Sequence, residues 1–269
     1  MRVVGVVSLL VALCLGPFGP GADAAAHSLY LEDLTWTELR DALAAGTTTT
    51  IIIPVGGTEQ SGPQIALGKH NIRAHVLAGR IAQALGDTLV APVVAYVPEG
   101  NISPPTEHMR FPGTISIPES AFKATLVAAA QSFRQAGFRH VVLLGDHGGY
   151  QAALKSVAAE LNRDWAKSTT RAHFIAEYYA ATRTAYVQAL RAKGLSEAEI
   201  GTHAGTADTS LMLAIDPAAV RTDRLGEAHG ALGVQGDARP STAALGQLGV
   251  EPIIQESVAA IRKARQDQR

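Results

Sequence analysis

Apolar, β-branched stretches alternate with amphipathic stretches along most of the chain. Residues 49–55 are almost entirely apolar and β-branched, which is typical of a strand buried on both faces. Similar stretches predict strands at 89–97, 140–144 and 172–178. Buried strands that alternate with helices form parallel sheets. We therefore expect one α/β domain, a three-layer α/β/α sandwich with a largely parallel sheet.

Helices are predicted between these strands. Thr35 and Glu38 form a capping-box pattern before apolar residues at helical spacing, so a first helix should follow them and end at Gly46. Further helices are expected at 71–85, 120–137, 151–165, 180–193, 209–215 and 250–265. Residues 99–118 are rich in proline and glycine and too long for a simple connection, so we expect a functional loop.

The N-terminal 24 residues have the features of an export signal. Arg2 precedes an apolar run at 3–15, which is too short to span a bilayer and is followed by Ala22-Asp23-Ala24, a signal-peptidase pattern. We expect a Sec-type signal peptide at 1–24 and a mature domain at 25–269, periplasmic or secreted and free of the membrane after cleavage. The alternative is a buried N-terminal element. Cys14, the single cysteine, would leave with the signal, and Leu13 before it does not fit a lipoprotein site.

Composition and charge narrow the class of partner. The 269 residues are 47% hydrophobic and 17% charged, which is typical of a globular domain rather than a disordered chain. With 23 basic and 24 acidic residues the net charge is -1, so the chain has no excess of positive charge that would attract nucleic acid. We expect a small-molecule substrate and no nucleic acid.

Polar residues that follow two of the predicted strands are the candidates for chemistry. Glu59 lies in a glycine-rich segment directly after the first strand, and His147 lies in another after residues 140–144. Ligands of open parallel sheets bind beyond the carboxyl ends of strands, where His70 at the next helix could join them. A glutamate and two histidines can hold a divalent ion with positions left for water and substrate. Structural roles for all three remain an alternative.

Five ordered motifs between about Pro54 and Gln247 resemble the creatininase family of metal hydrolases. The segment 56–63 and the following Leu67-Gly68-Lys69-His70 are similar to a G-S/T-x-E-Q-H-G-P-H-L-P-L-G-T-D run. Residues 107–114 resemble E-H-x-x-F-P-G-T, and 145–149 resemble N-G-H-G-G-N. Residues 203–213 are close to H-A-G-E-x-E-T-S-L-M-L, and 233–237 to G-V-x-G-D.

The resemblance implies an α/β/α sandwich, often hexameric, that hydrolyses a C–N bond of a cyclic or formyl amide with one or two divalent ions. By position, Glu59 and His147 match metal ligands of the family. His203 matches the histidine credited with proton transfer. We accordingly expect a homo-oligomer, a hexamer by resemblance.

Several positions depart from the family pattern. Ser61 stands where the family has a ligand histidine, and His70 where it has the aspartate that bridges two metals. Thr206 and Gly149 stand at positions where members carry a carboxylate ligand. We therefore expect one ion per chain, held by Glu59, His70 and His147. Zinc is our first choice, with manganese or iron as alternatives, because glutamate and histidine suit all three.

Other motif residues receive supporting roles. His108 and Tyr150 are predicted to contact substrate, while Asp146 could accept a hydrogen bond from a ligand imidazole. Asp208 is predicted to orient the backbone rather than to bind metal. A turn or cap role for Asp146, a loop role for His108 and a helix-start role for His203 stay open as alternatives.

The function expected from the sequence is metal-dependent hydrolysis of an amide C–N bond in a small, cyclic substrate. Two alternatives are kept. One is creatininase activity in the strict sense, converting creatinine to creatine. The other is a small-molecule-binding protein that has kept the fold and lost catalysis; Glu59, His147 and His203 argue against it.

Overall fold

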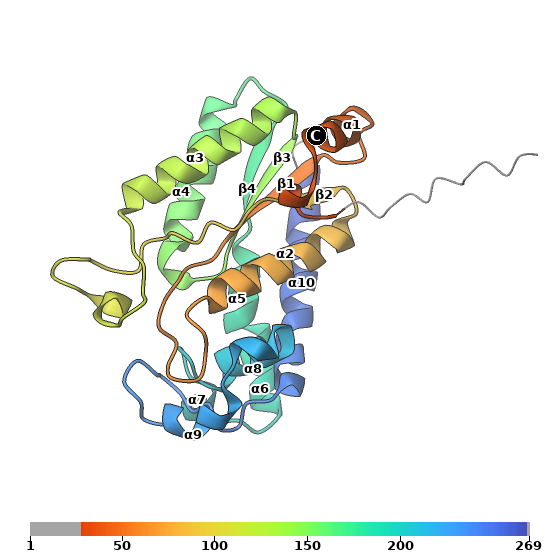
Figure 1. Ribbon diagram of the computed structural model, residues 1–269. Coiled ribbons are helices and arrows are strands. Elements are labelled where there is room, and N and C mark those ends of the chain that lie inside the picture. Colours follow the sequence, from red (N-terminus) through yellow and green to blue (C-terminus); the bar gives the residue numbers. More distant parts are fainter. Residues whose placement is uncertain (1–27, 268–269) are drawn as a thin grey trace, which may run out of the picture.

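The computed structural model describes residues 28–267 and contains a four-stranded parallel sheet at its centre (Figure 1). The strands are β1 (Thr50–Val55), β2 (Thr88–Val90), β3 (His140–Gly145) and β4 (Arg171–Phe174), in the order β2-β1-β3-β4. β1 pairs with β3 over its whole length, and the carboxyl ends Val55 and Gly145 lie opposite each other. The predicted signal peptide, residues 1–24, lies outside the described residues.

Helices cover both faces of the sheet, which confirms the three-layer α/β/α prediction. One face carries α3 (Glu119–Ala136) and α4 (Gln151–Asp164), and the other carries α2 (Lys69–Leu85), α5 (Ala176–Arg183) and α10 (Ala243–Gln266) (Figure 1). α1 (Trp36–Ala44) begins at the predicted Thr35–Glu38 capping box. The remaining α-helices lie beyond the carboxyl end of the sheet: α6 (Ala185–Ala192), α7 (Glu197–Ile200), α8 (Thr206–Ile215) and α9 (Leu225–Ala228). Short 3-10 helices span Leu31–Asp33, Glu107–Arg110, Gly148–Tyr150, Pro217–Ala219 and Thr222–Arg224.

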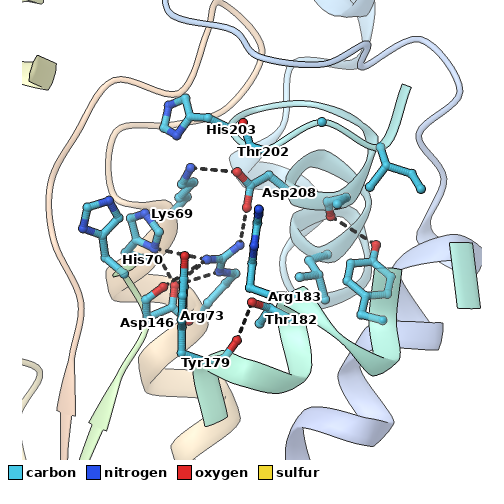
Figure 2. Close-up of a pocket in the computed structure, with 16 residues that line it drawn as sticks. Lys69, His70, Arg73, Asp146, Tyr179, Thr182, Arg183, Thr202, His203 and Asp208 are labelled. Atoms are coloured by element: carbon cyan, nitrogen blue, oxygen red, sulfur yellow. Dashed lines mark hydrogen bonds and ion pairs between the residues drawn. The ribbon is translucent and has the colours of Figure 1, made fainter. Parts of the chain in front are cut away.

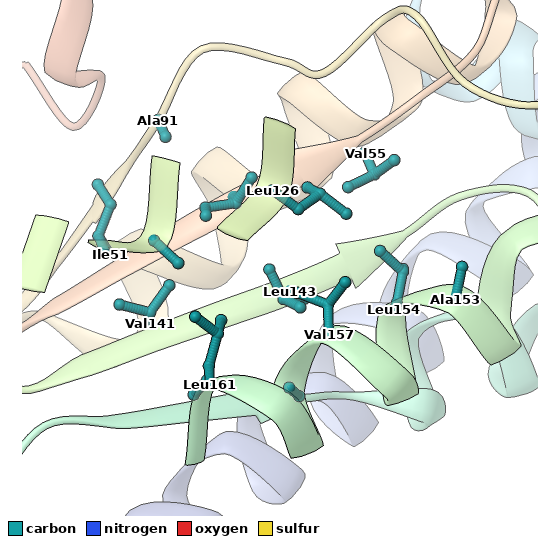
Figure 3. Close-up of a cluster of buried hydrophobic side chains, with 14 of the residues drawn as sticks. Ile51, Val55, Ala91, Leu126, Val141, Leu143, Ala153, Leu154, Val157 and Leu161 are labelled. Atoms are coloured by element: carbon teal, nitrogen blue, oxygen red, sulfur yellow. The ribbon is translucent and has the colours of Figure 1, made fainter. Parts of the chain in front are cut away.

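Alternate residues of β1 fill two separate cores. Ile51, Ile53 and Val55 pack with residues of α3 and α4; Figure 3 shows this core with Ile51 and Val55 labelled. Ile52 packs with residues of α2, α5 and α10 on the other face. All six residues of β1 are buried. Because side chains alternate across a strand, an unbroken apolar run is what a strand covered on both faces requires. The core thus fixes the carboxyl ends of β1 and β3, from which the candidate site projects.

Two predicted strands are shorter in the structure. Of the stretch 89–97 only the part up to Val90 lies in β2, because Pro92 has no N–H for a ladder hydrogen bond. A single bridge between Val55 and Val94 keeps the later part beside β1. β4 ends at Phe174, and the rest of the predicted strand turns into α5.

Three predicted helices have different limits. The predicted helix 180–193 is divided into α5 and α6 at Thr184, which adopts a non-helical backbone. α8 begins at Thr206 and α10 at Ala243, both earlier than predicted. Among residues 28–267, no helix combines the length and the apolar composition needed to cross a bilayer.

Candidate active site

Glu59 lies at the centre of the candidate site and is fully buried. It follows β1 on a loop in which Gly57 has φ 148°, a backbone conformation that favours glycine. Asn71 of α2 accepts a hydrogen bond from the Gly57 N–H at 2.9 Å and so ties the loop to that helix. The Glu59 N–H donates to the Leu67 carbonyl at 3.1 Å. These contacts fix the carboxylate at the carboxyl end of the sheet.

Three side chains from two other segments converge on Glu59 Oε2. Ligand atoms of Glu59, Glu99, His108 and His147 all lie within 4.8 Å of one another. His108 Nε2 is 3.2 Å and His147 Nε2 is 3.7 Å from Glu59 Oε2. His147 Nδ1 is 3.7 Å from Glu99 Oε2. Glu99 and His108 come from the long loop 91–118, and His147 follows β3. The four residues, called here the Glu/His cluster, have the donor chemistry of a divalent metal site.

The carboxylates of the Glu/His cluster are incompletely satisfied. Glu59 Oε2 and both carboxylate oxygens of Glu99 are buried and have no hydrogen-bond partner among the described residues. Burying such oxygens costs free energy unless a proton, a cation or a hydrogen bond compensates. Burial, and then the nearby Glu59 carboxylate, raise the pKa of Glu99 to about 9. Without a metal, Glu99 therefore holds a proton at neutral pH.

His70 is hydrogen-bonded through both of its ring nitrogens. Nε2 is 2.8 Å from Glu59 Oε1, and Nδ1 is 2.5 Å from Asp146 Oδ1. The Arg73 guanidinium also binds Asp146 Oδ1, with Nη2 at 2.6 Å. Burial raises the pKa of Asp146, but Arg73 and His70 lower it more, so the carboxylate stays ionised. Both nitrogens of His70 are thus held by carboxylates, one of them that of Glu59, and the ring lies edge-on to His147 with the centroids 5.1 Å apart.

Lys69 occupies the other side of Glu59. Its Nζ lies 3.3 Å from Glu59 Oε1, and the side chain is 1% exposed. Figure 2 shows its second contact, with Asp208 Oδ2 at 3.1 Å. Asp208 also binds Arg73 at 2.8 Å and accepts a hydrogen bond from the Ala204 N–H at 2.9 Å. Burial raises the pKa of Glu59, but Lys69 and then His70 lower it by more than burial raises it, so the pKa lies well below its ordinary value. Glu59 is thus a permanent anion with one oxygen facing Lys69 and the other facing the Glu/His cluster.

His203 approaches Glu59 from the segment before α8. The chain reverses at Ala204, which has φ 55° and is buried. His203 Nε2 lies 3.0 Å from the Gln60 carbonyl oxygen and 3.1 Å from the Gln60 amide nitrogen. The two amide hydrogens can go to the Gly233 carbonyl and His108 Nδ1. We therefore assign the hydrogen of the neutral His203 ring to Nε2, which then donates to the Gln60 carbonyl. Nδ1, 3.7 Å from Glu59 Oε1, is then the basic nitrogen. Burial, and then Lys69, lower the pKa of His203 to about 4, so the ring is neutral near pH 7.

Tyr150, predicted from the sequence to contact substrate, is instead buried beneath the site. Its hydroxyl lies 2.8 and 2.6 Å from the carbonyl oxygens of Val55 and Gly56, which share its single hydrogen, and it accepts from the His147 N–H at 2.9 Å. The side chain therefore joins the ends of β1 and β3 and positions His147. It lines neither of the two hollows that border the site.

Two hollows open beside the site. A small cavity of about 80 Å³ is lined by Lys69, His147, His203 and Asp208, among other residues (Figure 2). A wider cleft of about 590 Å³ reaches His108 and His203 from outside, with Phe111 and Leu232 on its walls. Of the described residues, only His203 lines both. The two hollows therefore meet at the His203 side chain.

The predicted and observed groupings overlap only in part. Glu59 and His147 come together as expected, and His108, predicted to contact substrate, joins them in the Glu/His cluster. His70 lies beside the cluster, but both of its ring nitrogens are already held, by Glu59 and Asp146. Glu99, Lys69 and Arg73 were not anticipated. A signal for Glu99 exists in the sequence, since Pro98-Glu99-Gly100 follows an apolar stretch, as Glu59 and His147 follow theirs.

A family model described as "Creatininase: Creatinine amidohydrolase" matches residues 32–261. The chain belongs to the creatininase family. The resemblance carried by the sequence motifs is thereby confirmed. Members of the family are metal-dependent hydrolases that act on C–N bonds.

Curated relatives have different named activities. The mycofactocin precursor peptide peptidase of Mycolicibacterium smegmatis is 32% identical over 180 residues, which is 65% of this chain. The match spans 61% of the length of that relative. The creatinine amidohydrolase of Pseudomonas putida is 27% identical over 207 residues, which is 74% of this chain and 76% of that protein.

Solved creatininase structures share the fold. A structure titled "Creatininase Mn" superposes with a TM-score of 0.72 at 23% identity and covers 88% of this chain and 99% of its own. A mutant creatininase described as "Zn-Zn type" superposes with a TM-score of 0.69, also at 23% identity, and covers 89% of this chain and 99% of its own. These proteins therefore carry manganese or zinc, and the Glu/His cluster of this chain could hold a metal ion.

Proposed function

We propose that this chain is a metal-dependent hydrolase that cleaves an amide C–N bond of a small substrate. The observation that carries the proposal is the Glu/His cluster, in which three buried carboxylate oxygens lack a hydrogen-bond partner among the described residues. Two carboxylates and two imidazoles are ligands that zinc, manganese and iron accept. The donor set and the unsatisfied oxygens both fit a divalent ion.

Glu59, Glu99, His108 and His147 would hold the ion. This set keeps the predicted Glu59 and His147 and replaces His70 by Glu99 and His108. When bound, a divalent ion supplies a Lewis acid that polarises a carbonyl group and acidifies water. Because the pKa of Glu99 is raised to about 9, binding at neutral pH requires Glu99 to release a proton.

The remaining residues would orient and transfer protons. Hydrolysis adds a hydroxyl group to the carbonyl carbon, breaks the C–N bond and places a proton on the leaving nitrogen. His203 Nδ1 is the basic nitrogen beside Glu59 and borders both hollows, so it can take a proton from water and return it to that nitrogen. Gln60 holds His203 through its carbonyl oxygen and keeps Nδ1 free of a proton.

Two classes of amide are candidate substrates. The creatinine amidohydrolase relative supports a small cyclic amide, as the sequence motifs do. The cleft of about 590 Å³, with its apolar residues Phe111 and Leu232, has room for a larger group, and the peptidase relative supports a short peptide. We favour the small cyclic amide, because the cavity beside His203 and Lys69 is only about 80 Å³.

A metal and turnover assay tests the proposal. Purified protein is loaded with zinc or manganese, dialysed, analysed for bound metal, and assayed on creatinine, lactams, cyclic ureides and short peptides. We expect bound metal and hydrolysis of at least one class, both lost in Glu59→Ala. Lys155→Ala, at an exposed position of α4, serves as the control and should keep both. Protein that binds no metal and hydrolyses none of these substrates would leave a binding role instead.

We also propose export to the periplasm, with assembly into a homo-oligomer in the mature form. The motif at residues 1–24 supports export, and the family resemblance supports assembly. Expression with the native N-terminus tests both. N-terminal sequencing should find cleavage near residue 24, and light scattering should give a mass above that of one chain. An uncleaved monomer in the cytosol contradicts both.

A further inference from the structure

Lys69 is a buried cation in direct contact with the candidate metal ligand Glu59. The ammonium group lies between Glu59 Oε1 and Asp208 Oδ2, at 3.3 and 3.1 Å, with 1% of the side chain exposed. Fully buried lysines are rare unless they are paired. Here two carboxylates pair with it, one of them shared with the Glu/His cluster on its other oxygen. Glu59 thus lies between the Lys69 ammonium group on one side and the Glu/His cluster, which suits a metal ion, on the other.

The surroundings of Lys69 have the donors of a cation site. Glu59 Oε1 and Asp208 Oδ2 both approach the ammonium group, at 3.3 and 3.1 Å. Carboxylate oxygens are also ligands of divalent ions, as in the Glu/His cluster. The lysine side chain fills this place and supplies its positive charge.

Lys69 also has one N–H group to spare. An ammonium group has three donors, and among the described residues its contacts are the two carboxylates Glu59 and Asp208. Lys69 lines the small cavity together with His147 and His203 (Figure 2). A substrate carbonyl oxygen placed there would be within reach of the third N–H.

We propose that Lys69 acts as the second cation of the active site. It fills the place beside Glu59 that a second divalent ion would need, so the site takes one ion. It also donates a hydrogen bond to the carbonyl oxygen of the substrate as that oxygen gains negative charge. The inference rests on the proposed hydrolase function, and it adds a catalytic residue and a metal count to it.

Two substitutions of Lys69 distinguish the effect of the side chain's volume from the effect of its positive charge. Lys69→Ala removes the charge and leaves room beside two carboxylate oxygens, whereas Lys69→Met removes the charge and keeps the space filled. After equilibrium dialysis against zinc, we expect one ion per chain in the native protein, two in Lys69→Ala and one in Lys69→Met. In chelator both variants should melt at least about 5 °C lower, because two buried carboxylates lose their counter-charge. Zinc should restore the melting temperature of Lys69→Ala more than that of Lys69→Met.

The hydrogen-bond donor role is tested by kinetics. Loss of one donor to a developing oxyanion typically lowers kcat by about 100-fold or more. We expect this loss in Lys69→Met with little change in KM, and no loss in Lys155→Ala. Two ions in the native protein, or one in Lys69→Ala, would overturn the metal count, and an unchanged kcat in Lys69→Met would overturn the catalytic role. No ion in the native protein would overturn the proposed function and this inference together.

Discussion

Glu59 and Glu99 are both buried in the Glu/His cluster, but their surroundings move their pKa values in opposite directions. Lys69 and His70 keep Glu59 ionised despite its burial. Glu99 lies near Glu59 without a cation of its own, and its pKa rises to about 9. Two like charges at this distance are stable only when one is neutralised. A proton does this in the metal-free protein, and a metal ion would do it in the loaded one.

Substitution by glutamine should distinguish the two carboxylates. Glu99→Gln resembles the protonated side chain, so in chelator at pH 8 we expect the free energy of unfolding to be unchanged or higher. Glu59→Gln removes the anion that faces Lys69 and His70 and should cost about 3 kcal/mol. Both variants should bind zinc at least about 10-fold more weakly, because each replaces an anionic carboxylate ligand by a neutral amide. Denaturant unfolding and calorimetric zinc titration provide the two measurements. Equal destabilisation of both variants in chelator would contradict these assignments.

At the scale of elements, periodicity in the sequence located all four strands and the long helices, but not the short helices α7 and α9 and not the ends of several elements. The buried run 49–55 and the capping box of α1 are local signals, and both were predicted closely. Pro92, a local signal that the apolar run 89–97 hides, ends β2 early. α10 begins at Ala243 after the cap residue Thr242, whose hydroxyl accepts from the Leu245 N–H, although Gly246, Gly249 and Pro252 are typical of a loop.

The glycines of α10 permit close packing against other helices. A Cβ at Gly246 would lie 1.9 Å from the Ser210 carbonyl oxygen of α8, and one at Gly249 would lie 2.7 Å from the Tyr186 ring. Helix propensity favours alanine over glycine by about 1 kcal/mol, but these contacts favour glycine. Contacts with other helices therefore explain the two glycines in α10, which the helical pattern of the sequence does not.

Gly246→Ala tests this balance between propensity and packing. We expect a net loss of about 2 kcal/mol in the free energy of unfolding, because the clash with backbone exceeds the gain in propensity. Gly226→Ala in α9 is the matched control: nothing lies within 4 Å of its Cβ, so that variant should be neutral or up to about 1 kcal/mol more stable. Urea unfolding of the three proteins gives the comparison. A stabilised Gly246→Ala would show that α8 and α10 can separate at little cost.

At the scale of the whole molecule, the site joins segments that are distant in sequence. Glu59 and His147 follow adjacent parallel strands, and this arrangement could be predicted because carboxyl ends of such strands share one edge. Glu99 and His108 lie on a loop without periodicity, so their approach to Glu59 could not be derived from the pattern. His70 was expected to face the metal, but Asp146 and Arg73, which hold it, belong to a buried ion-pair network that only the three-dimensional packing reveals.

Buried titratable groups across the molecule make its stability depend on pH in a definite direction. Burial is the first cause that lowers the pKa of His147 to about 3 and of His173 and His203 to about 4. The next causes are His70 for His147, His140 for His173 and Lys69 for His203. In the unfolded chain these histidines take up protons near pH 6.5, so below that pH the unfolded state binds more protons. The free energy of unfolding therefore falls as the pH drops from about 6.5 to 4.

Glu99 has the opposite effect on the alkaline side. Its folded pKa of about 9 lies above its unfolded value, so its contribution is fully present below about pH 4.5 and is lost as the pH rises to about 9. Metal-free protein should thus be most stable near pH 6.5. Each group changes the slope by about 1.4 kcal/mol per pH unit within its range.

Unfolding in denaturant with chelator, from pH 4.5 to 9, measures both limbs of this profile. His173→Gln should flatten the acid limb by about 1.4 kcal/mol per pH unit and leave the alkaline limb unchanged. Glu99→Gln should flatten the alkaline limb, and it should steepen the acid limb, where the effect of Glu99 opposes that of the histidines. Zinc should also flatten the alkaline limb of the native protein, because bound metal replaces the proton on Glu99. An alkaline limb that survives in Glu99→Gln would assign it to another group and remove the main electrostatic argument for Glu99 as a metal ligand.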